Sequence, residues 1–120
     1  MKYLKPLLLS LFILAAYGAV QAQGAQRFID EAENMFENEG YYEAIDLYKK
    51  AYSKEKDIDE KGRLLFQIAE CYRKVLDMEQ ATVWYNKALK ARHDNPMAYF
   101  WIAETKRKQG NFAEAITYYN

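Results

Sequence analysis

Apolar side chains recur at three- and four-residue intervals along most of this 120-residue chain, which is the spacing of one face of an α-helix. Short connecting segments at residues 38–40, 76–78 and 109–111 interrupt the pattern. Strand-like alternation of apolar and polar positions is rare. The pattern therefore predicts an all-α fold built from pairs of helices joined by tight turns.

Residues at the expected helix ends refine this picture. Gly40 is expected to supply the backbone freedom that ends the first helix. Residues 53–62 are mostly charged or polar and are expected to form the loop between the first two pairs. Asn95 followed by Pro96 is typical of a helix start, with a polar cap and proline at the first helical position.

A repeated motif marks the second helix of each pair, in which alanine is followed four positions later by tyrosine. The step from the first copy to the second is slightly longer than the step from the second to the third. A small side chain lets two helices cross closely, and the bulky ring fills the gap to the next pair. One hairpin cannot bury such a face alone, so a stacked array is expected. The three motifs are Ala44–Tyr48, Ala81–Tyr85 and Ala115–Tyr119, and Ala32, Ala69 and Ala103 take the matching places in the first helices.

The amino-terminal segment has the layout of a secretory signal peptide. Lys2 and Lys5 are followed by an uncharged, mostly apolar run at residues 7–20, and then by the small-residue pattern that ends in Ala22. A membrane-spanning helix would need about 20 apolar residues, so we favour cleavage after residue 22. Gln23 then begins the mature chain; without a cysteine there, we expect no lipid anchor at this end.

Charge and cysteine content exclude several classes of function. Removal of residues 1–22 would leave 15 basic and 17 acidic side chains, a balance that gives no reason to propose nucleic acid as a partner. Cys71 is the single cysteine and is expected to be buried rather than reactive. His93 is the single histidine and is expected in a loop, so neither a zinc set nor a nucleophilic triad can be assembled. No catalytic residue, metal site or cofactor is predicted, and we expect no enzyme.

The chain resembles the tetratricopeptide repeat family, whose period of about 34 residues matches the spacing of the repeated motif. The resemblance covers essentially all of residues 26–120. The segment Ile68–Tyr72 with the following alanine–tyrosine motif carries it best, whereas Lys106 stands where an aromatic residue is usual. The resemblance implies an α-solenoid, with the repeat array at 23–120 following the expected signal peptide at 1–22. The repeats are placed at about 25–58, 62–95 and 96–120, the last of them truncated.

A narrower resemblance concerns the order of the parts. A signal peptide, a short linker and a tyrosine-rich array are similar to the amino-terminal region of Bacteroidota envelope proteins in which such repeats precede a WD40-like propeller and an OmpA-type domain. Some of those proteins serve type IX secretion. This resemblance implies export, with the repeats in the periplasm or on the periplasmic face of the outer membrane.

The family resemblance implies a scaffold that binds a protein or peptide in a concave groove, with no nucleic acid and no transmembrane helix in the mature chain. Two alternatives stay open: a spacer in front of an enzymatic or peptidoglycan-binding domain beyond residue 120, and an array that associates through its unfinished carboxyl-terminal end. The last repeat stops before its second small residue, so we expect the natural chain to continue.

Candidate partner-binding residues come from the first helix of each repeat, which lines the concave side in the family. An aromatic, an acidic and a basic position recur there at the period of the repeat. Trp101 is expected to be exposed beside Arg107 if a peptide groove is present, and to be core otherwise. The candidates are Phe66, Glu70, Arg73, Phe100, Trp101, Glu104 and Arg107.

Overall fold

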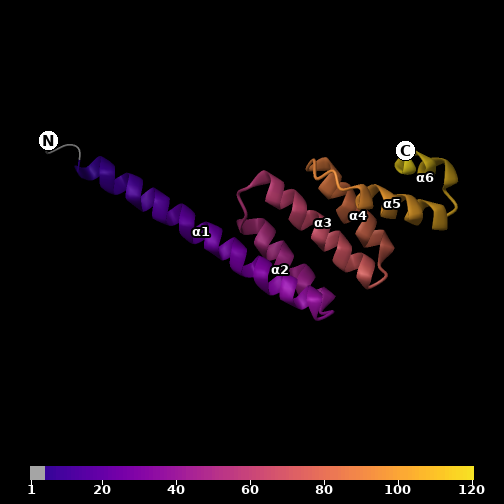
Figure 1. The fold of residues 1–120 in the computed structure, drawn as a ribbon, viewed down its shortest axis with the longest axis horizontal. Coiled ribbons are helices and arrows are strands. Elements are labelled where there is room, and N and C mark those ends of the chain that lie inside the picture. The colour runs from indigo at the N-terminus through magenta and orange to yellow at the C-terminus, as the bar shows by residue number, and fades with distance from the viewer. Residues whose placement is uncertain (1–4) are drawn as a thin grey trace.

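The computed structural model describes residues 5–120, with side chains at 10–17 and 24–120. These residues form six α-helices in three consecutive hairpins, which confirms the predicted all-α hairpin fold (Figure 1). Each second helix also packs on the first helix of the next pair, so the hairpins stack in chain order. The helices are α1 (Lys5–Glu37), α2 (Tyr41–Lys54), α3 (Ile58–Lys74), α4 (Met78–Lys90), α5 (Pro96–Lys108) and α6 (Phe112–Tyr119).

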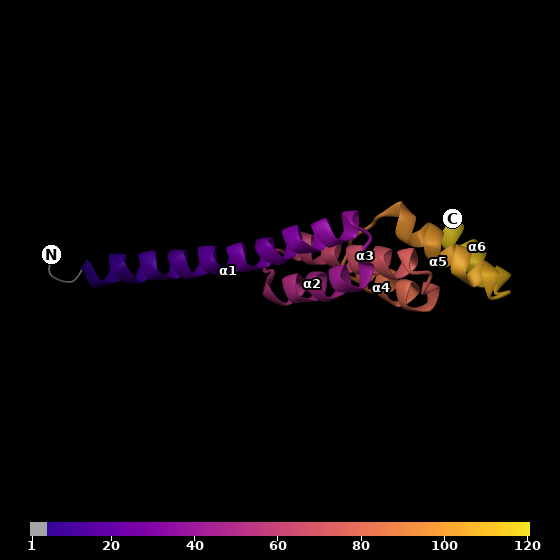
Figure 2. The ribbon, with the colours of Figure 1, turned by 90° about the horizontal axis from the view of Figure 1, so that it is seen from below.

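Helix α1 is longer than the hairpin requires and continues without a break past Gln23. Its amino-terminal part projects away from the other helices, and the molecule measures 73 × 31 × 15 Å (Figures 1 and 2). The described side chains from Leu11 to Leu14 are exposed, and the first buried side chain in the described part of α1 is Ala25. Among the described residues, no helix combines the length and the apolar character needed to cross a membrane.

The alanines predicted at helix crossings lie in the interior. Ala32 and Ala44 in the first hairpin, and Ala69 and Ala81 in the second, have no exposed surface. Because a methyl group takes little space, the two backbones of each hairpin can approach closely there. In the third hairpin Ala103 and Ala115 are buried in the same way.

The tyrosines of the repeated motif differ in burial according to what packs over them. Tyr48 and Tyr85 are almost fully buried, because α3 packs on α2 and α5 packs on α4. Tyr119 lies on the last described helix and remains 46% exposed. Helix α1 also buries Ala25 and Ile29, and Ile29 belongs to the core cluster formed with α2 and α3.

Four helices end in the same hydrogen-bonded turn. At the end of α1, Glu39 donates its backbone N–H to Phe36 and Gly40 donates to Met35, which is the Schellman pattern. The left-handed residue is Glu39 (φ 62°), whereas Gly40 has a φ of −81°, so the predicted role of Gly40 was wrong. The same pattern, with left-handed residues Leu76, Arg92 and Gly110, ends α3, α4 and α5.

The loop predicted at residues 53–62 is much shorter, because α2 runs to Lys54 and α3 begins at Ile58. Asp57 caps α3 by accepting a hydrogen bond from the backbone N–H of Glu60, and Asp59 and Glu60 place negative charge at the positive end of the helix. The polar residues thus start a helix rather than form a loop. The predicted start of α5 is confirmed, since Asn95 caps it and Pro96 occupies its first turn.

Cys71 belongs to the core between the first hairpin and α3, as predicted. It has no exposed surface, and burial raises the pKa of its thiol to about 12. A thiol that stays protonated is a poor nucleophile, so Cys71 acts as a small packing residue.

Candidate functional site

A three-residue polar unit connects the two helices of the second hairpin. Arg73 donates from Nη2 to one oxygen of Glu70 at 2.7 Å and from Nε to the other at 3.2 Å, and both residues lie on α3. The hydroxyl of Tyr85, on α4, donates to the same carboxylate. Burial, together with this contact to Glu70, raises the pKa of Tyr85 well above its ordinary value. Glu70 is therefore held from two helices.

The third hairpin repeats this unit at the equivalent positions. Arg107 donates from Nη2 to Glu104 at 2.9 Å and from Nε at 3.3 Å, and the hydroxyl of Tyr119 donates to Glu104 as well. The hydrogen bonds from Arg107 and Tyr119 lower the pKa of Glu104 to about 2. The structure thus brings together four of the predicted residues as two equivalent acid–base pairs on α3 and α5.

Trp101, on α5, packs against the unit of the second hairpin. The guanidinium of Arg73 lies 4.5 Å from the centre of the Trp101 ring, so the cation on this ring comes from the preceding hairpin and not from Arg107. Trp101 is half-buried and packs against the second core cluster. Its indole N–H is buried without a hydrogen-bond partner among the described residues. The ring is therefore partly a packing residue between repeats, in contrast to the exposed position expected for a peptide groove.

The two predicted phenylalanines differ in position. Phe66 is 8% exposed and lies 5.5 Å from Tyr85 and 5.4 Å from His93 between ring centres, so it is a core residue. We therefore remove Phe66 from the candidate surface. Phe100, its counterpart in the next repeat, is 41% exposed and contacts Trp101 edge-on at 5.0 Å.

The first hairpin adds an acidic part to the same face. Arg63 on α3 pairs with Glu60 at 2.6 Å and with Glu33 of α1 at 3.3 Å. A hollow of about 250 Å³ lies beside these residues. Glu33, Phe36, Glu37, Tyr48 and Gln67 line it. We call the outer surface of α1, α3 and α5, with Glu33, Glu37, Arg63, Glu70, Arg73, Glu104 and Arg107, the first-helix face.

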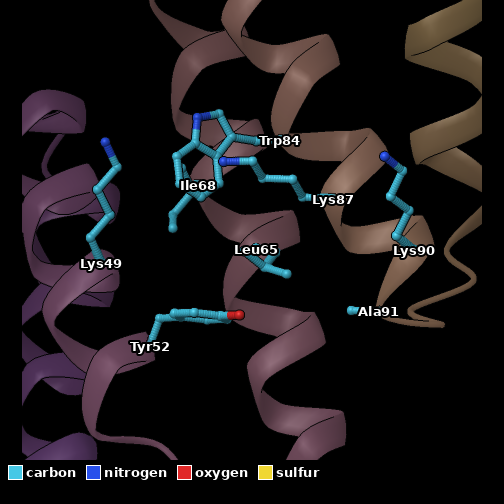
Figure 3. Close-up of a pocket in the computed structure, with 8 residues that line it drawn as sticks. All are labelled: Lys49, Tyr52, Leu65, Ile68, Trp84, Lys87, Lys90 and Ala91. Carbon is cyan, nitrogen blue, oxygen red and sulfur yellow. The ribbon is translucent and has the colours of Figure 1, made fainter.

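A second feature, which was not predicted from the sequence, lies between the second helices of the first two hairpins. A groove of about 470 Å³ separates α2 from α4 and has α3 as its floor (Figure 3). Its lining residues are Lys49, Tyr52, Leu65, Ile68, Trp84, Lys87, Lys90 and Ala91. One signal in the sequence could have indicated the groove. Its residues are three positions apart in Lys49–Tyr52 and in Trp84–Lys87–Lys90, and this spacing places their side chains along one side of each helix. We call this the lysine groove.

The described residues contain no cluster of three histidine, cysteine, aspartate or glutamate side chains that could hold a metal ion. The arginines of the first-helix face, Arg63, Arg73 and Arg107, are instead each paired with a glutamate. This arrangement can present charged and aromatic groups in fixed positions to a partner.

Comparisons with known proteins agree with this geometry. Residues 62–95 and 98–120 match the sequence profile of the tetratricopeptide repeat, and these segments contain the α3/α4 and α5/α6 hairpins apart from the first turn of α3 and the start of α5. A 56-residue segment is 39% identical to anaphase-promoting complex subunit 6 of Dictyostelium discoideum. This segment makes up 47% of this chain and 6% of that protein. The chain therefore spans a small part of this relative's length.

The α1/α2 hairpin lies outside the two matched segments. It nevertheless has the same small residues at its crossing and the same buried tyrosine, Tyr48, as the hairpins that match. Helix pairs stacked in this way form extended binding surfaces and seldom carry chemistry of their own. The α3/α4 and α5/α6 hairpins are thus similar to the tetratricopeptide repeat in sequence and in helix packing.

Proposed function

We propose that this protein is an exported scaffold that binds an extended segment of another protein on the first-helix face. The observation that carries the proposal is the repeated unit in which Glu70 fixes Arg73 and Glu104 fixes Arg107. A side chain already held in one conformation loses little entropy when it binds a partner. The Arg107 unit would give a peptide a fixed contact point, and the Arg73 unit of the preceding hairpin would support the surface beneath it.

The partner-facing residues in this proposal are those that remain accessible. Arg107 is 50% exposed, and Phe100 presents part of its ring beside it. Glu70, Arg73 and Trp101 lie deeper and support the surface from beneath. Aromatic and arginine side chains contribute most of the binding energy in many protein interfaces, so this edge of α5 is the proposed centre of contact.

Photocrosslinking in cells tests this surface. A photoreactive amino acid in place of Lys108, next to Arg107 on α5, should trap a protein partner, and Arg107→Ala should reduce the adduct. The matched control places the same group at Lys56 in the exposed α2–α3 turn, where no adduct is expected. Equal trapping at both positions would contradict the proposed face.

Export is the second part of the proposal. Its support is that Ala25, the first buried side chain among the described residues, comes just after the predicted cleavage site, while the described side chains from Leu11 to Leu14 contribute nothing to the core. The proposed location is the periplasm or the periplasmic face of the outer membrane, as the first module of a longer envelope protein.

Mass spectrometry of the protein from the cell envelope tests export. The expected amino terminus is an unacylated Gln23. An intact Met1, or a lipid on the terminal residue, would contradict the processing.

A further inference from the structure

The lysine groove places three ammonium groups around an apolar floor. Lys49 enters from α2, and Lys87 and Lys90 enter from α4, with Leu65 and Ile68 of α3 between them (Figure 3). All three lysines are exposed, and Trp84 is half-buried at the centre. The groove thus combines positive charge at its rim with apolar and aromatic surface at its base.

Trp84 brings two of these charges together. The Nζ of Lys87 lies 4.0 Å from the centre of the indole ring and the Nζ of Lys49 lies 5.0 Å from it. Lys49 also donates to the hydroxyl of Tyr72 at 3.4 Å, and Tyr72 stacks on Trp84 at 6.5 Å. The indole attracts each cation, but the two cations repel one another.

No carboxylate compensates this charge within the described part of the chain. The groove has no acidic lining residue, and Lys49, Lys87 and Lys90 take part in none of the ion pairs found among the described residues. The arginines of the first-helix face differ, because Arg63, Arg73 and Arg107 are each paired with a glutamate. The unpaired positive charge of the lysine groove therefore remains available to an external anion.

We propose that the lysine groove binds an acidic peptide segment of another protein, one that carries an aspartate or glutamate next to an apolar side chain. The carboxylate would lie between Lys49 and Lys87 and relieve their repulsion. The apolar side chain would cover Leu65, Ile68 and the free edge of Trp84. This second binding site is separate from the first-helix face, so the protein would hold two partners, or two segments of one partner, on opposite helices of the same hairpins.

A peptide fits the groove better than a membrane surface does. Proteins that bind membranes insert projecting apolar or aromatic side chains below the lipid headgroups. Here Trp84 is half-buried and two ammonium groups lie against its ring, so it cannot project. A recess bordered by cations favours a short chain that enters it.

The two tryptophans make the test direct, since Trp84 reports on the lysine groove and Trp101 reports on the first-helix face. The full chain with ¹⁵N-labelled indoles would be titrated with a synthetic peptide of alternating aspartate and leucine. The peptide should shift the Trp84 indole signal, with an affinity that falls as salt is added. The Trp101 signal should stay in place, and a peptide with asparagine for aspartate should have no effect.

Matched variants locate the charge. The double variant Lys49→Gln with Lys87→Gln should bind the acidic peptide with about tenfold lower affinity, which is the expected effect of removing two surface charge pairs. Lys56→Gln with Lys108→Gln removes the same charge elsewhere and should leave the affinity unchanged. Because all four lysines are exposed, circular dichroism should show equal helicity for both variants.

The alternative outcomes are distinguishable. A shift of the Trp101 indole signal without a shift of the Trp84 signal would place the acidic peptide on the first-helix face. This result would overturn the proposed binding site in the lysine groove and leave the proposed scaffold function intact. No shift of either signal would overturn the groove, as would equal weakening by the two double variants. Binding to phosphatidylglycerol vesicles that depends on Lys49 and Lys87, without peptide binding, would identify a lipid surface instead.

Discussion

Tyr85 on α4 donates its hydroxyl hydrogen to the carboxylate of Glu70 on α3, and so joins the two helices of a hairpin through a polar contact beside the core. We expect Tyr85→Phe to lower the free energy of unfolding by about 1–2 kcal/mol, since it leaves a partly buried carboxylate with one partner fewer. Urea unfolding measures this loss. Tyr119→Phe breaks the equivalent contact on an exposed residue and should lower the free energy of unfolding by less. Equal losses in the two variants would contradict the role of burial.

The carboxylate of Glu104 should titrate with a pKa of about 2, because Arg107 and Tyr119 donate hydrogen bonds to its charged form. NMR titration of the side-chain carboxyl carbon gives this value. In Arg107→Ala the pKa should move back toward the ordinary value of 4.5. The pair therefore stays charged throughout the physiological range, and any stability it contributes is lost progressively as the pH falls from about 4.5 to about 2.

The left-handed residue after α3 offers a stabilising substitution. Leu76 has a φ of 64° and is 84% exposed, so its side chain gains little from packing and strains the backbone. We expect Leu76→Gly to raise the free energy of unfolding by about 1 kcal/mol, because glycine adopts this conformation without the steric cost. The rise in melting temperature is the measurement.

Gly110 provides the matched opposite case, with a φ of 77° after α5. A Cβ atom there would meet no other atom within 4 Å, so Gly110→Ala tests the backbone conformation alone. It should destabilise the protein by about 1 kcal/mol. A neutral result at both positions would show that these turns are free to relax.

Alkaline solution should destabilise the fold. Burial raises the pKa of Cys71 from 9.0 to about 12 and raises those of Tyr48 and Tyr85 above their ordinary 10.0. The unfolded chain therefore releases these protons at lower pH than the folded chain, so stability is constant below about pH 9 and falls as the pH rises further.

The urea midpoint as a function of pH measures this loss. Cys71→Ala should delay its onset by removing the group that titrates first in the unfolded chain, and it keeps a small side chain in the core. A midpoint that does not change in alkaline solution would contradict the burial of these three groups.

The hairpins and their crossing points could be predicted from the sequence because the determinants are local. Ala69 and Ala81 had to lie where α3 and α4 cross, since a larger side chain at either position would force the backbones apart. The placement of Asn95 and Pro96 at a helix start followed from the same kind of local rule. The identity of the left-handed turn residue could not be predicted in this way. The hydrogen bonds at the end of α1 place Glu39 in the left-handed conformation, although the adjacent residue is a glycine.

Only the tertiary structure decided which repeated residues form a surface. Phe66 and Phe100 occupy equivalent positions, yet His93 and Tyr85 cover the first while the second remains exposed. What covers a side chain is supplied by an element distant in sequence, so the repeat predicts a residue's position but not its exposure. The lysine groove depends on the same principle, because Lys49 and Lys87 become neighbours through the packing of α2 and α4 on α3.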